Sequence, residues 1–169
     1  EIIERFTDNG LTVINMMIGG FSNAIYGRPG RDEEIERIQK SLIAAGNVGL
    51  PVVEYNWYAH RLTEGYFFVE GRGGAGYTGY QYDRGKNLPP IPEKGTHDAD
   101  SLWENLTYFL EAIIPVAEKA GVRMALHPND PPVPKSRGND QIMATFEDWK
   151  RMITLVDSPS NGVTYHSGV

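Results

Sequence analysis

The stretch "VRMALHPNDPP" (residues 122–132) joins a short apolar run to a histidine and then to three prolines. Proline has no backbone N–H to donate to a β-ladder, so a strand through residues 122–126 must end near His127. The imidazole of His127 is therefore predicted to stand at the carboxyl end of a strand.

Strand-like and helix-like segments alternate on both sides of this stretch. Strands are predicted at residues 11–20, 50–58, 122–127 and 162–168, and helices at residues 31–46, 98–121 and 145–156. The helix predictions rest on apolar residues at helical spacing, on acidic residues near the helix starts and on glycines near the ends, such as Gly46. Thr145 and Asp148 have the spacing of a capping box. Phe146, Trp149 and Ile153 are predicted to form the buried face of the last helix.

This alternation predicts an α/β fold with a parallel sheet. Four βα units occupy 169 residues, whereas a complete (β/α)8 barrel takes about 250 residues. We therefore expect parallel (β/α) units that form about half of a TIM barrel, in a single domain over residues 1–169. The first ten residues resemble the last turns of a helix, and no helix follows the last strand, so we expect a domain truncated at both ends.

The longest connection between a strand and the following helix covers residues 59–97. It contains the glycine- and tyrosine-rich segment "GRGGAGYTGYQYDRG" (71–85). Loops at the carboxyl ends of parallel strands carry the active sites of such folds. Because its aromatic content is high for a linker, residues 59–97 are predicted to be an ordered active-site loop that acts as a lid.

Composition excludes several classes of partner. The chain has 40% hydrophobic residues, a formal net charge of -6 and scattered basic residues, so a nucleic-acid partner is not expected. Neither a signal peptide nor an apolar stretch of roughly 18 residues is present, so a membrane partner is not expected either. The absence of cysteine excludes disulfides and thiolate ligands, and it fits a cytoplasmic protein.

His127 and His166 are each placed at the carboxyl end of a predicted strand, and these strands are consecutive. In a parallel sheet both rings would point to the same rim, which is an arrangement typical of a metal site for Mn, Fe, Co, Ni or Zn. The alternative is that each histidine caps its own strand or bonds a nearby carbonyl. His60 and His97 are expected to be solvated polar residues.

Further polar residues are predicted near the same rim. Asp130 and Arg72 are predicted to be catalytic. Asp130 would carry a proton or orient His127, and Arg72 would bind a carboxylate from the lid. Asn56 and Arg137 are predicted to bind substrate, through a hydroxyl and a carboxylate respectively. The alternatives are ordinary turn chemistry for Asn56 and Asp130 and solvated surface charge for the two arginines.

The segment "AIIPVAEKAGVRMALHPNDPPVP" (112–134) resembles the hallmark sequence of the metal-dependent mannonate dehydratases, which are xylose-isomerase-like barrels. The similarity extends to "VVEYNWY" (52–58) and "MATFEDWKRMITLVDSPSNGVTYHSG" (143–168). The resemblance implies a hydro-lyase that converts D-mannonate to 2-dehydro-3-deoxy-D-gluconate in hexuronate catabolism. It further implies Mn²⁺ or Fe²⁺ as cofactor and a small sugar acid as substrate.

The resemblance also implies roles for the two histidines. His127 matches a metal-ligand histidine, whereas His166 stands where family members usually have a cysteine ligand. An imidazole nitrogen in place of a thiolate sulfur makes the ligand set chemically harder. The remaining ligands of the family, a histidine and an aspartate on later strands, have no counterpart before Val169. The open sheet edges of a half barrel predict a homo-oligomer.

Two other functions fit the same sequence. A sugar isomerase or epimerase can use the same barrel, because fold does not fix reaction. The chain can also be an inactive structural fragment that lacks part of its metal site. Detection of a keto-deoxy acid or of an isomerised sugar as product separates the two enzymatic functions.

Overall fold

The computed structural model describes residues 2–61 and 63–168. A parallel sheet of four strands forms its centre, in the order β1–β2–β5–β8. The strands are β1 (Asn15–Met17), β2 (Val52–Tyr55), β5 (Arg123–Leu126) and β8 (Asn161–Val163). Each predicted strand is present, and neighbours in the chain are neighbours in the sheet, as in consecutive units of a (β/α)8 barrel. The predicted fold class is confirmed.

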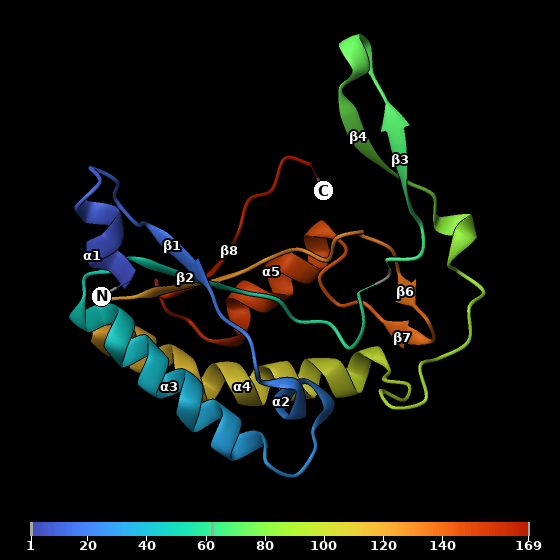
Figure 1. Cartoon of the computed structure of the whole chain (residues 1–169). Helices are drawn as coiled ribbons and strands as arrows, with labels where there is room; N and C mark the ends of the chain where they lie inside the picture. Colours follow the sequence, from blue (N-terminus) through green and yellow to red (C-terminus); the bar gives the residue numbers. More distant parts are fainter. Residues whose placement is uncertain (1, 62, 169) are drawn as a thin grey trace.

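Helices connect the strands and pack on one side of the sheet (Figure 1). They are α3 (Arg31–Asn47), α4 (Ala99–Ala120) and α5 (Phe146–Leu155). Two short helices, α1 (Ile2–Thr7) and α2 (Ser22–Tyr26), lie near the amino-terminal end of the chain. The connections from strand to helix are long and those from helix to strand are short, which places the larger loops at the carboxyl rim of the sheet.

An aromatic cluster between the sheet and α4 forms the centre of the core. Phe109 lies 5.0 Å from the ring of Phe21 and 5.1 Å from that of Trp57, measured between ring centroids. Trp57 is fully buried, and its indole nitrogen donates to the carbonyl of Leu102 at 3.3 Å. Burying each such side chain contributes about 1.5–3 kcal/mol, so this cluster fixes the end of β2 against α4.

Gly46 does not end α3, as the sequence suggested, but lies inside it. A Cβ atom at this position would stand 2.2 Å from the carbonyl oxygen of Ala120 in α4. The glycine therefore permits a backbone contact between α3 and α4, and the helix ends after Asn47. The prediction for α4 holds, since Gly121 caps it in the left-handed region with φ 71°.

The predicted buried face of α5 is wrong in part. Phe146 is 67% exposed and Ile153 is 44% exposed, whereas Met152 is fully buried. The turn of an α-helix places Phe146 and Ile153 to one side of the face that Met152 and Trp149 present to the core. Phe146, the first residue of the helix, instead lies under the ammonium group of Lys150 at 4.6 Å.

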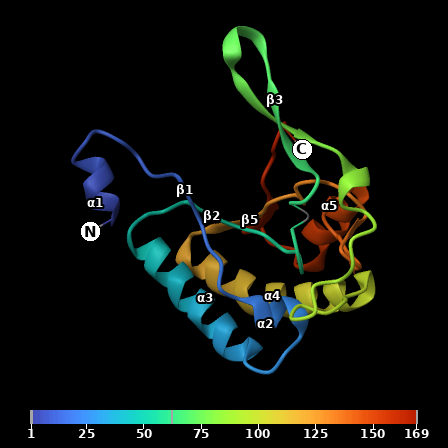
Figure 2. The same ribbon diagram turned by 45° about the vertical axis from the view of Figure 1, so that its right-hand side comes forward.

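The long connection after β2 contains an antiparallel hairpin. Strands β3 (Tyr66–Glu70) and β4 (Gly76–Tyr80) are joined by the 3₁₀ turn η1 (Arg72–Gly74), and η2 (Tyr82–Arg84) follows. The hairpin projects from the rest of the molecule in both views (Figures 1 and 2). Its sequence thus forms regular structure, and its action as a lid stays a prediction.

The helices give no sign of a membrane-spanning segment. Within residues 2–61 and 63–168, none of them combines the length and the apolar character needed to cross a bilayer.

The capping box of α5 provides a test of the fold. Thr145 Oγ1 accepts from the N–H of Asp148, while the Asp148 carboxylate accepts from the N–H of Thr145. We expect Thr145→Ala to lower the free energy of unfolding by about 1 kcal/mol in urea titration. Thr154→Ala in the same helix is the control, because Thr154 is exposed and alanine favours helix. Equal stability of both variants would contradict the capping role.

Candidate active site

The two predicted metal ligands lie at the carboxyl rim of the sheet. His127 directly follows β5, and His166 lies three residues beyond the end of β8. Their ring centroids are 5.2 Å apart, and the ring planes are inclined by 49°. The structure therefore brings these side chains together, as expected for adjacent parallel strands.

The hydrogen bond of His127 suits metal binding. Its Nδ1 atom lies 2.7 Å from the carbonyl oxygen of Pro128, which can only accept. The neutral ring therefore carries its proton on Nδ1 and keeps the Nε2 lone pair free, the arrangement that metal-binding histidines usually have. The described part of the chain contains no group of three or more His, Cys, Asp or Glu residues placed to hold an ion. These two histidines each present a ring at the rim, and their role as metal ligands stays a prediction.

A cavity beside His127 collects three of the predicted site residues. It has a volume of about 250 Å³ and is lined by Met17, Asn56, Tyr58, Arg61, His127 and Asp130. Asn56 follows β2 and donates from Nδ2 to the sulfur of Met17 at 3.4 Å. Asn56, His127 and Asp130 thus share one cavity although the sequence separates them widely.

Asp130 forms a network with two residues that the sequence analysis missed. Arg61 donates from Nε to the Asp130 carbonyl and from Nη2 to its carboxylate Oδ2, both at 2.9 Å. The hydroxyl of Tyr66, the first residue of β3, donates to Oδ1 at 2.5 Å. Burial and the bond to Asp130 raise the pKa of Tyr66, so its phenol keeps its proton at neutral pH. Both oxygens of the Asp130 carboxylate are therefore engaged.

Side-chain amides hold the loop that carries Asp130 in place. Asn129 is fully buried and accepts from the N–H of Met143 at 2.8 Å, while its amide donates to the Trp57 carbonyl at 3.4 Å. Gln141 donates to the carbonyls of Pro131 and Val133, at 3.1 and 2.8 Å. These side-chain amides replace the backbone ladder that the prolines cannot make, and they give His127 and Asp130 a fixed support.

The structure does not bring Arg137 into this cavity. It lies in the tight turn between β6 (Lys135–Ser136) and β7 (Asn139–Asp140), with φ 49°. Its guanidinium donates to the carboxylate of Glu64 and to the Pro89 carbonyl, both at 2.8 Å. The group thus joins two segments of the long loop, and its role in substrate binding stays a prediction.

Arg72 also lies apart from the cavity. It is exposed in η1, at the tip of the projecting hairpin (Figure 2). A catalytic role for this residue requires the hairpin to move, and it stays a prediction.

The His60 side chain is largely buried, contrary to expectation, and His97 is half-buried. The His60 side chain is only 12% exposed and lies 3.6 Å from the Glu64 carboxylate and 3.5 Å from Lys94 Nζ. His97 stacks on the ring of Tyr26 at 4.9 Å and contacts the Lys94 carbonyl. His97 thus holds the end of the long loop against α2, whereas His60 joins residues within the loop. Burial and the positive charge of Lys94 lower the pKa of His60, in opposition to Glu64.

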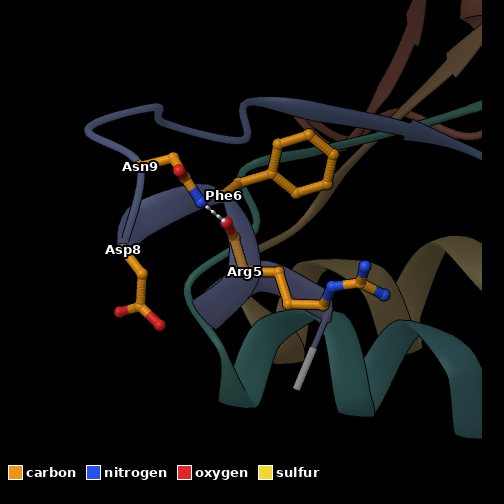
Figure 3. Close-up of a pocket in the computed structure, with 4 residues that line it drawn as sticks. All are labelled: Arg5, Phe6, Asp8 and Asn9. Carbon is orange, nitrogen blue, oxygen red and sulfur yellow. Dashed lines mark hydrogen bonds between the residues drawn. The ribbon is translucent and has the colours of Figure 1, made fainter.

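A second cavity lies at α1 and shares no residue with the cavity beside His127. It has a volume of about 520 Å³ and is lined by Arg5, Phe6, Asp8 and Asn9, all from α1 and the turn after it (Figure 3). The Asn9 amide donates to the Arg5 carbonyl at 2.8 Å, and Asp8 points away from the other side chains. Residues from one short segment form an open surface hollow without the convergent polar groups of an active site.

Parallel βα units with histidine, carboxylate and amide groups at the carboxyl rim are typical of (β/α)8-type enzymes. Comparison with known proteins shows which family the chain resembles. The family model for D-mannonate dehydratase (UxuA) matches residues 91–169. Mannonate dehydratases of Thermotoga maritima and Streptococcus pneumoniae (strain 70585) are each 34% identical, over 84% and 82% of the chain. The chain is thus similar to mannonate dehydratases over most of its length.

A solved structure supports the same assignment. The crystal structure of mannonate dehydratase from Streptococcus suis serotype 2 superposes with a TM-score of 0.86 over 96% of the chain, at 30% identity. The chain covers 49% of that protein, 48% of the T. maritima relative and 44% of the S. pneumoniae relative. It thus spans about half the length of the relatives it matches.

The lowered pKa of His60 predicts a pH dependence of stability. The unfolded chain takes up the His60 proton near the ordinary pKa of 6.5, whereas the folded chain takes it up only at lower pH. The free energy of unfolding should therefore be highest above pH 6.5 and fall as the pH drops from 6.5 towards 5. His60→Gln should flatten this fall, measured by urea titration at several pH values.

Lys94→Gln is a second variant for the same effect. Removing the positive charge beside His60 should also flatten the curve, because it raises the pKa of the folded histidine. Two variants with the full wild-type slope would show that His60 does not control stability in this range.

Proposed function

We propose that this chain carries part of the active site of a metal-dependent mannonate dehydratase. The reaction is the removal of water from D-mannonate, which yields 2-dehydro-3-deoxy-D-gluconate in hexuronate catabolism. The observation that carries the proposal is the 5.2 Å approach of the His127 and His166 rings at the rim of a sheet that matches this family. A cytoplasmic location and a homo-oligomeric state belong to the same proposal.

The chemistry explains why such an enzyme uses a metal. The proton next to a carboxylate is weakly acidic, and hydroxide is a poor leaving group. A bound divalent ion, Mn²⁺ or Fe²⁺, supplies stabilisation of the negative charge that develops on oxygen. His127 and His166 are the residues of this chain that would hold it, and later parts of the complete protein would have to supply further ligands.

The other residues of the cavity suit a polyhydroxy acid. Asn56 can bind a sugar hydroxyl through its amide, and Asp130 is placed beside it with its carboxylate bonded to Arg61 and Tyr66. Arg72 and Arg137 are proposed to act on the substrate only if the long loop rearranges, because both lie outside the cavity. An isomerase or epimerase would use similar groups, but the relatives favour the dehydratase.

The metal site is tested by removing one ligand. In the complete protein, His127→Ala should abolish tight metal binding, so that elemental analysis after desalting finds far less Mn or Fe than in wild type. Turnover of D-mannonate to the keto-deoxy acid should be lost with it. His97→Gln is the control, because this histidine stacks on Tyr26 away from the rim. Unchanged metal content in His127→Ala would reject the proposed ligand.

Residues 1–169 alone should associate and have little turnover. The edge strands β1 and β8 each have a partner on one side only. An apolar groove of about 510 Å³ lies beside β1, with Ile18, Val48 and Val53 among its lining residues. Exposed strand edges and apolar surface favour pairing between chains, although a second copy would bring the same two histidines again. A stable monomer in light scattering that turns over D-mannonate with Mn²⁺ would contradict this expectation.

A further inference from the structure

We propose that Arg61 binds the carboxylate of the substrate, and that Asp130 and Tyr66 are positioning residues that hold its guanidinium. The inference rests on the proposed function, since it requires a sugar acid in the cavity beside His127. It gives Arg61 the part that the sequence analysis assigned to Arg72 and Arg137. It also changes the part of Asp130 from a proton carrier to a support.

Among the described residues that line the cavity, Arg61 is the one permanently charged cation. Of these six residues, only Arg61 carries a positive charge at every relevant pH. Its side chain is 46% exposed, so a ligand in the cavity can reach it. A planar guanidinium fits a carboxylate with two parallel hydrogen bonds, which a lysine cannot reproduce.

Asp130 uses only part of the guanidinium. Nε and Nη2 bond to the Asp130 carbonyl and carboxylate, and the Tyr66 hydroxyl also contacts the guanidinium. The N–H groups on Nη1 and the second N–H of Nη2 form the donor pair that a carboxylate needs. The Nε and Nη2 side of the Arg61 guanidinium is thus fixed by Asp130, while the Nη1 and Nη2 side can bind a ligand.

The support for Arg61 is stiff. Asp130 bonds through its carbonyl and both carboxylate oxygens, and its neighbour Asn129 is anchored on Met143 and Trp57. An arginine held in this way loses less side-chain entropy when it binds a ligand. The other two candidate arginines differ, because Glu64 and Pro89 occupy Arg137 and the hairpin tip carries Arg72 away from the cavity.

The engaged carboxylate explains why Asp130 is assigned a positioning role. A general base must offer a lone pair to the proton that it removes. Tyr66 donates to one oxygen of Asp130 and Arg61 to the other, so each oxygen already accepts a hydrogen bond within this network.

The first experiment compares a charged ligand with a neutral one. Binding of D-mannonate and of D-mannonamide, which has the same hydroxyls without the charge, is measured by calorimetry on the complete protein with Mn²⁺. Arg61→Gln should weaken D-mannonate binding by about 10- to 100-fold, the value of a charged hydrogen-bond pair, and leave D-mannonamide binding nearly unchanged. Arg61→Lys should recover only part of the loss. Arg84→Gln is the matched control, because Arg84 lies over the Phe67 ring outside the cavity.

The second experiment separates positioning from proton transfer. Asp130→Asn and Tyr66→Phe should raise the KM for D-mannonate with a smaller change in kcat, because they loosen Arg61. Loss of a general base would instead lower kcat by about 10²- to 10⁴-fold with little change in KM. Such a collapse in Asp130→Asn would overturn the positioning role.

The outcomes also distinguish this inference from the proposed function. If Arg61→Gln weakens both ligands equally, or neither, Arg61 does not bind the carboxylate even in an active dehydratase. If wild type binds D-mannonate through Arg61 but forms no keto-deoxy acid, the carboxylate site stands and the dehydratase function falls. Circular dichroism of each variant shows whether a loss of binding reflects unfolding.

Discussion

The buried amide of Asn129 is the interaction on which the site depends. The chain leaves β5 at a proline-rich turn that cannot continue a ladder, so its polar backbone groups need partners from elsewhere. Asn129 joins this turn to the Met143 backbone on one side and to the Trp57 carbonyl on the other. His127, two residues before Asn129, and Asp130, directly after it, take their direction from that anchor. An apolar residue here would leave the N–H of Met143 without its acceptor in the protein interior.

A cluster of ionisable groups joins distant parts of the long loop. Glu64 receives Arg137 at 2.8 Å and lies 3.6 Å from His60, and Lys94 approaches the same histidine. The Arg137–Glu64 pair joins positions 73 apart, and the Lys94–His60 contact joins positions 34 apart. Both lie near the hairpin, whose β3 strand carries Tyr66 into the Asp130 network. The geometry of the cavity is thus linked to a cluster of ionisable groups outside it.

Much of the fold follows from the sequence because local patterns determine it. The apolar periodicity of α4, the capping box at Thr145 and the left-handed cap at Gly121 each act within a few residues, and the strands end where prolines or polar turns begin. The errors arise where a distant contact decides the outcome. Gly46 permits close contact with the carbonyl of Ala120 rather than ending its helix. In α5, Met152 is buried in the core whereas Phe146 is exposed.

The same limit applies to the site. The position of His127 and His166 could be predicted, because parallel strands place their carboxyl ends at one rim. Arg61 could not, because its partner Asp130 is 69 residues away and its own loop has no periodic pattern. The proximity of an arginine to the end of β2 was the available signal, but other arginines in the same loops gave an equal signal.

The backbone contact at Gly46 has a mechanical consequence. Two helices separated by side chains can slide as rotamers change, whereas helices in direct backbone contact have no such freedom at the point where they touch. The layer made by α3 and α4 is therefore a rigid support for the sheet that packs on it. Motions that admit a ligand to the rim have to occur in the loops above it, among them the hairpin that projects from the rest of the molecule.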